Sequence, residues 1–178
     1  KKEVLEMSNE FGIAAVAIQD GATNWKKAGF SVEETTGLVR ESINLMIAAA
    51  ETELDMGAAT EYLIAIMKGF KYEASEAGRI VDVLNKVSNE YATSVTQLGI
   101  GVSKLSPVAK KMGFTLEETA ASLTPVIEIF RSGDEAATAM RTGLLKLGDD
   151  ASPVQGALKE LGIKQFDLNG QMKSGKEL

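Results

Sequence analysis

The sequence contains no cysteine and no histidine, and these two absences exclude several kinds of chemistry. Without them, the chain can form no disulfide, no thiolate metal site, no usual zinc site and no Ser-His or Cys-His nucleophilic pair. Long apolar runs are also missing, and those present are far shorter than the roughly 18 residues that a membrane span needs. The sequence therefore predicts neither a membrane span nor a signal peptide.

Positive charge is in the minority, with 19 Lys and Arg against 25 Asp and Glu, which gives a formal net charge of -6. The basic residues are scattered along the chain, and a negative field repels phosphate backbones. We therefore expect no specific binding to nucleic acid.

The chain has 178 residues, of which 44% are hydrophobic, enough to build one core and short enough for one domain. Its first residues are helix formers without a cap, and its last residues carry no helix-terminating signal. We expect a piece of a longer protein, with a helical core segment at residues 1–163 and a terminal extension at residues 164–178.

Apolar residues recur in steps of three and four through most of the chain, the period of an amphipathic helix. Five stretches show it most clearly: residues 38–49, 62–67, 80–87, 95–112 and 123–130. Possible helix starts carry capping-box spacing at Ser31 with Glu34, Ser94 with Gln97, Thr115 with Glu118, Ser132 with Glu135, and Ser152 with Gln155. The pattern predicts an all-α fold of about seven to nine helices.

Gly-Phe pairs at residues 29–30, 69–70 and 113–114 follow helical stretches, where glycine can take the left-handed C-cap and Phe can fold back. The stretch AGFSVEET at residues 28–35 is echoed by MGFTLEET at residues 112–119. Units of about 40 residues predict an array of antiparallel helical hairpins. Convergent capping chemistry is the alternative explanation.

Two further features of the sequence bear on this predicted helical fold. Pro107 and Pro125 lie inside apolar stripes, where each removes a backbone hydrogen bond and should kink or break its helix. Asn169-Gly170 is a two-residue turn signal between short alternating stretches, which predicts a small C-terminal β-hairpin within residues 164–178.

No catalytic, cofactor-binding or metal-binding residues are predicted. Residues 167–170 superficially resemble the start of a calcium loop, but the later ligands are missing. The paired acids at 33–34, 117–118 and 134–135 fit opening helical turns better than acid-base catalysis. Gly99 and Gly101 suggest close helix packing. Trp25 could be a half-buried anchor or a contact site, and the seven methionines fit a core better than a partner surface.

The chain resembles the core region of phage tail tape measure proteins of long-tailed phages. The likeness rests on MGFTLEETAA at residues 112–121, an apolar helix, and then GDEAATAMR at residues 133–141. It extends to residues 158–163 and 167–172 downstream and residues 77–84 upstream. Ala137, where the family usually has glycine, and the acidic stretch at residues 51–56 depart from the family pattern.

This resemblance implies a structural, non-enzymatic segment that acts in tail assembly and tail-length determination inside the tail tube. The implied partners are the tail tube protein, tail-tip proteins, tail assembly chaperones and a possible second copy of the chain. The implied location is the virion tail, with the host cytoplasm during assembly. The alternative function is a helical-repeat adaptor that binds a protein partner. A third interpretation, an enzyme using Ser, Lys, Asp or Glu alone, lacks a convergent cluster.

Overall fold

A computed structural model describes residues 2–52, 54–148, 153–164 and 173, and every regular element within them is a helix. The α-helices are α1 Lys2–Phe11, α2 Ala15–Lys27, α3 Val32–Ala48, α4 Met56–Phe70, α5 Ala77–Glu90, α6 Val95–Lys111, α7 Leu116–Phe130, α8 Gly133–Leu147 and α9 Pro153–Glu160. Two short 3-10 turns, Ala50–Thr52 and Ala74–Glu76, precede α4 and α5. The all-α class agrees with the sequence prediction.

The prediction of a C-terminal β-hairpin is wrong. No strand occurs among the described residues, and Lys164 and Lys173, the described residues of that segment, are in no regular element. The Asn169-Gly170 turn itself lies outside the described residues. A two-residue turn signal is a local preference, and a hairpin also needs a surface to pack on.

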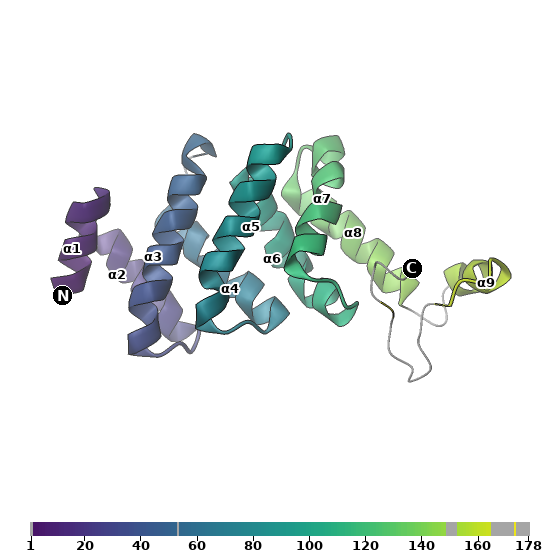
Figure 1. The fold of residues 1–178 in the computed structure, drawn as a ribbon, viewed down its shortest axis with the longest axis horizontal. Helices are drawn as coiled ribbons and strands as arrows, with labels where there is room; N and C mark the ends of the chain where they lie inside the picture. The colour runs from purple at the N-terminus through teal and green to yellow at the C-terminus, as the bar shows by residue number, and fades with distance from the viewer. Residues whose placement is uncertain (1, 53, 149–152, 165–172, 174–178) are drawn as a thin grey trace.

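The first eight helices form two layers along a line (Figure 1). The odd-numbered helices α1, α3, α5 and α7 make one layer, and the even-numbered helices α2, α4, α6 and α8 make the other. Up to α8, each helix contacts the next helix and the next but one, so each hairpin packs on the following hairpin. The two ends of this array are far apart, as in a helical solenoid.

The repeat has a step of 42 residues, fixed by three equivalent corners. At each corner an aromatic backbone N–H bonds a carbonyl five residues earlier: Phe30 to Trp25 at 3.3 Å, Tyr72 to Met67 at 2.8 Å, and Phe114 to Ala109 at 2.9 Å. The residue before each aromatic is left-handed: Gly29, Lys71 and Gly113. These are Schellman C-caps, and they set the boundary between consecutive hairpins.

The middle corner differs from the sequence prediction. The predicted turn at Gly69-Phe70 is wrong, because both residues belong to α4 and Lys71 takes the left-handed conformation, with φ of 59°. Gly69 is instead needed for packing, since a Cβ atom there would overlap the Ser106 hydroxyl of α6. The even-numbered layer therefore uses this glycine for close approach of two helices.

Helix starts follow the predicted caps in most places. Ser31 with Glu34 and Thr115 with Glu118 form complete capping boxes. Ser94 and Ser132 cap α6 and α8 through their side chains only. The predicted box at Ser152 lies outside the described residues. Both α6 and α7 continue through their prolines, so neither helix is broken there.

In α6 the hydroxyl of Ser106 lies 3.1 Å from the Ser103 carbonyl, the group that Pro107 cannot bond. This hydroxyl therefore partly replaces the backbone donor that the proline removes.

Candidate interaction surface

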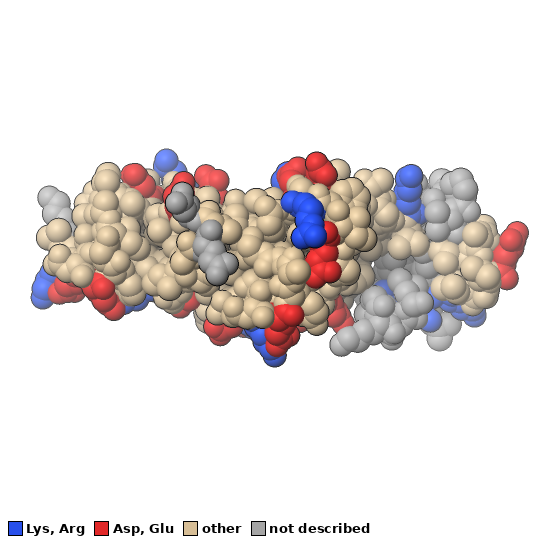
Figure 2. Space-filling view, turned by 90° about the horizontal axis from the view of Figure 1, so that it is seen from above, with Lys and Arg blue, Asp and Glu red and all other residues tan. Residues whose placement is uncertain are grey.

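One edge of the array collects exposed apolar side chains. We call it the upper edge; it comprises the turns at residues 12–14, 49–52, 54–55, 91–94 and 131–132, at the top of Figure 1. Ile47, Tyr91, Ile129 and Phe130 lie at the ends of α3, α5 and α7 on this edge, and all four are exposed. Seen from above, the molecule shows broad uncharged surface along its length, with most charged groups toward the margins (Figure 2). Such a row of apolar groups on helix ends is suited to protein contacts.

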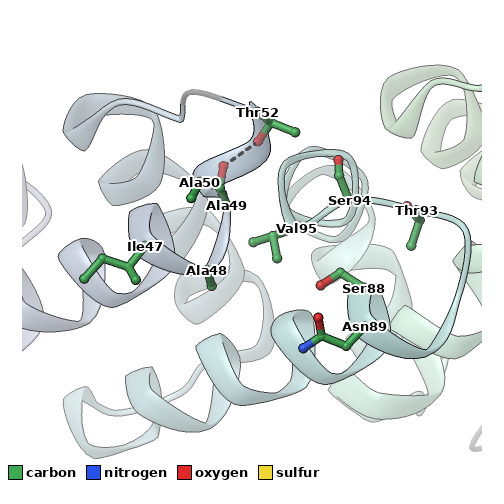
Figure 3. Close-up of a pocket in the computed structure, with 10 residues that line it drawn as sticks. All are labelled: Ile47, Ala48, Ala49, Ala50, Thr52, Ser88, Asn89, Thr93, Ser94 and Val95. Atoms are coloured by element: carbon green, nitrogen blue, oxygen red, sulfur yellow. Dashed lines mark hydrogen bonds between the residues drawn. The ribbon is translucent and has the colours of Figure 1, made fainter.

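A pocket of about 400 Å³ opens on this edge between α3, α5 and α6 (Figure 3). Its walls come from the end of α3 and its 3-10 turn, the end of α5 and the start of α6. The lining residues are Ile47, Ala48, Ala49, Ala50, Thr52, Ser88, Asn89, Thr93, Ser94 and Val95. None of these ten described lining residues is acidic or basic.

Most polar groups in this pocket already have partners within the protein. The Thr52 hydroxyl donates to the Ala49 carbonyl at 2.9 Å, the Ser88 hydroxyl donates to the Asn85 carbonyl at 2.8 Å, and Ser94 caps α6. The Thr93 hydroxyl oxygen is buried and has no hydrogen-bond partner among the described residues. The hydroxyls of Thr52, Ser88 and Ser94 serve to end and begin helices, which is a structural use of the residue types.

An ion-pair cluster lies on the opposite edge, where helices α5 and α7 begin. Arg79 makes a two-pronged contact with Glu117 of α7, at 2.7 and 2.9 Å from one guanidinium nitrogen and 2.9 Å from another. It also bonds Glu76 at 2.8 Å and lies 5.6 Å from the Tyr72 ring centre. Hydrogen bonds to Glu76 and Glu117 raise the pKa of Arg79, so it stays charged.

The pKa of the acidic partner, Glu117, shifts in the opposite direction. Partial burial raises the pKa of Glu117, but hydrogen bonds from its own backbone N–H and from Arg79 outweigh burial, and the pKa is lowered. Glu34 at the start of α3 has a lowered pKa because the Ser31 backbone N–H bonds its carboxylate. These carboxylates stabilise helix starts and link hairpins, as expected for acids in opening turns.

Several other residues named in the sequence analysis contribute to the core, to helix packing or to helix starts. Trp25 is fully buried, so it is neither a half-buried anchor nor a surface contact. Gly99 and Gly101 face Tyr62 and Leu123 so closely that the prediction of close helix packing is confirmed. The pairs at 33–34, 117–118 and 134–135 lie in first helical turns. The calcium-loop stretch at residues 167–170 lies outside the described residues.

Two searches over the described part of the chain bear on function. No group of three or more acidic residues there is arranged to hold a metal ion. None of its helices is both long enough and apolar enough to cross a membrane.

Comparison with known proteins shows which family this chain matches. Over residues 1–178 the chain matches the family described as phage-related minor tail protein. It is 27% identical over 172 residues to the tape measure protein of Pneumococcus phage Dp-1, covering 97% of this chain and 15% of that protein. It is 29% identical over 147 residues to the probable tape measure protein of Escherichia phage P2, covering 83% of this chain and 18% of that protein.

A third relative is the probable tape measure protein of Clostridium phage phiCD119, at 26% identity over 147 residues, or 82% of this chain and 16% of that protein. The chain thus spans less than a fifth of the length of each of these three relatives. No solved structure is significantly similar to it.

Proposed function

Because the chain belongs to the phage-related minor tail protein family, with a structural role in the phage tail, we propose that it is a folded segment of a tape measure protein that acts in tail assembly and tail-length determination. Residues 1–163 would be the helical segment of a longer polypeptide. No enzymatic activity is part of this proposal.

The observation that carries the proposal is the combination of coverage and fold. The likeness to a tape measure protein extends over 97% of the chain, and residues 2–147 within it fold into stacked hairpins instead of one continuous helix. A straight α-helix over residues 2–147 would span about 220 Å. Four stacked hairpins advance by roughly 10 Å each, or about 40 Å. This segment would therefore contribute a compact body, with the measuring shaft elsewhere in the polypeptide.

The partners that fit this role are other tail components. During assembly in the host cytoplasm the segment would meet the tail assembly chaperones, and in the particle it would meet the tail tube protein or the tail-tip proteins. The upper edge, with Ile47, Tyr91 and Ile129 exposed, is the part of its surface best suited to such contacts. The particle tail is the proposed final location.

Tail length in the phage or prophage that encodes this chain tests the proposal. We expect an in-frame deletion of residues 2–147 to shorten the tail by about 40 Å, or to prevent tail formation that the intact chain restores. Electron microscopy of purified particles measures either result. Shortening by about 220 Å would mean that the segment is extended in the tail and would contradict a compact body.

A helical-repeat adaptor is the second candidate, and the exposed row along the upper edge favours it. In that case the segment would bind a protein partner without any part in length. Tails of unchanged length after the deletion would support the adaptor and reject the ruler role.

A further inference from the structure

The contact lines between neighbouring odd-numbered helices, which we call seams, differ in their charges. In the α1–α3 seam, Arg40 lies 3.0 Å from the carboxylate of Glu10. In the α5–α7 seam, Arg79 lies 2.7 Å from the carboxylate of Glu117. The described residues of the α3–α5 seam form no such ion pair. Since Arg40 belongs to α3 and Arg79 to α5, both arginines are engaged on the far sides of their helices.

The α3–α5 seam instead has a groove of about 400 Å³ with a carboxylate from each helix. Glu41 of α3 reaches across the seam, because a Cβ atom on Gly78 of α5 would lie 3.6 Å from its carboxylate. Asp82 follows Gly78 by one helical turn, so it lies on the same face of α5. Both acids line the groove, and none of its described lining residues is basic.

These two carboxylates are left with few partners. Glu41 accepts a hydrogen bond at 3.1 Å from the Asn44 amide of its own helix, and the Asp82 side chain makes no hydrogen bond or ion pair with the described residues. Asp82 is exposed and Glu41 is partly exposed, so a ligand can reach both. An incoming arginine or lysine would supply the positive charge that Arg40 and Arg79 supply in the neighbouring seams.

The groove continues into the pocket on the upper edge. Ile47 and Ala48 line both cavities, so the two are adjacent. The pocket on the upper edge has no charged residue among its described lining, and Ile47 and Val95 contribute apolar surface to it (Figure 3). On α5, Asp82 lines the groove and Asn89 lines the pocket, and the helix rises about 10 Å between them. An extended chain covers that distance in about three residues.

We infer that the α3–α5 groove binds an extended segment of a partner protein that carries an arginine or lysine and, about three residues away, an apolar side chain. The basic group would lie between Glu41 and Asp82, and the apolar side chain would enter the pocket on the upper edge. The amides of Asn85 and Asn89 line the path between these points and can bond the backbone of the segment. The partner would be a tail component, and only its identity rests on the function proposed above.

Two peptide probes test the groove, with arginine and leucine about three residues apart in either order and alanine elsewhere. They are titrated into the isotope-labelled 178-residue chain and followed by NMR. At least one peptide should shift the backbone amide signals around Asp82 and Asn89, and added salt should weaken its binding. The same peptide with glutamate in place of arginine should give no shifts, because the groove repels it. This result does not depend on tail length, so the groove and the ruler role can fail separately.

A double variant, Glu41→Gln with Asp82→Asn, removes both charges and keeps the side-chain shapes. We expect it to bind the peptide at least about fivefold more weakly. Asp20→Asn with Glu61→Gln is the matched control, because it removes the same two charges from exposed positions of α2 and α4 that line neither cavity. This control should bind like the original chain, and the NMR spectrum of each free variant checks that it stays folded.

Three results would overturn the inference: no shifts with either peptide, equal binding of the glutamate peptide, or equal affinity of the double variant and the original chain. The same signals could also shift with magnesium chloride alone or on concentrating the chain alone. Either outcome would assign the groove to a metal ion or to a second copy, and would likewise reject a basic partner segment.

Discussion

The indole Nε1 of Trp25 donates a hydrogen bond to the hydroxyl of Ser42 across 3.0 Å, and both side chains are 0% exposed. The same hydroxyl oxygen accepts a bond from Thr60 at 3.1 Å and donates to the Leu38 carbonyl at 3.2 Å. One serine thus joins α2, α3 and α4 in the core. All its hydrogen-bonding capacity is used, which is the condition under which a buried polar group stabilises a fold.

Replacing Ser42 by alanine should destabilise the chain by about 2–3 kcal/mol. The change leaves the Trp25 indole N–H and the Thr60 hydroxyl buried without this partner, and each loss carries a desolvation penalty. Urea unfolding followed by fluorescence measures the effect cleanly, because Trp25 is the only tryptophan. Ser88→Ala is the control, since the Ser88 hydroxyl bonds only within its own helix and should change stability by less than about 1 kcal/mol.

The left-handed corner at Lys71 offers a stabilising change. Lys71 has φ of 59°, whereas the equivalent corners use Gly29 and Gly113. An L-residue in this conformation costs roughly 1 kcal/mol relative to glycine. We expect Lys71→Gly to raise the free energy of unfolding by about 0.5–1 kcal/mol and Gly29→Ala, whose Cβ would meet open space, to lower it by a similar amount. Equal effects of both changes would contradict the assignment of the corners.

Local signals in the sequence predicted much of the fold, and contacts between distant residues account for what they missed. Ser31 and Glu34 are three residues apart, so their capping box was readable directly. The sequence predicted units of about 40 residues but not the exact step of 42, because Lys71 gives no left-handed signal and Gly69-Phe70 gives a false one. The surroundings of Trp25 depend on Ser42, 17 residues away, and no local pattern predicts that pairing.

The exposure of surface residues was also hard to predict, because it depends on contacts between residues that are distant in the sequence. The apolar period over residues 123–130 gave no prediction for Ile129, which is 79% exposed, whereas Leu45 in the equivalent place of α3 is fully buried. That comparison requires the helix register that the folded corners supply.

Gly69 should not tolerate a side chain. A Cβ atom there would overlap the Ser106 hydroxyl and lie 3.1 Å from the Pro107 nitrogen, which belongs to the backbone and cannot turn away. We expect Gly69→Ala to lower stability by about 1–3 kcal/mol despite the better helix propensity of alanine. Gly37→Ala in α3 meets nothing within 4 Å and should raise stability by up to about 1 kcal/mol. Thermal unfolding by circular dichroism compares the two, and equal shifts would contradict close packing of α4 on α6.

The Arg79–Glu117 pair should make stability depend on acid pH. The pKa of Glu117 is lowered from 4.5 in the folded chain, so its stabilisation is present above the unfolded pKa and is lost as pH falls through the folded value. Both side chains are nearly half exposed, which limits the pair to about 1 kcal/mol or less. Glu117→Gln should therefore be less stable than the original chain at pH 7, and the difference should shrink as pH falls below 4.5 and the carboxylate of the folded chain becomes protonated. Urea unfolding across this range measures it, with Glu33→Gln at the corresponding place in α3 as the control. A difference that stays constant with pH would show that the carboxylate charge does not contribute.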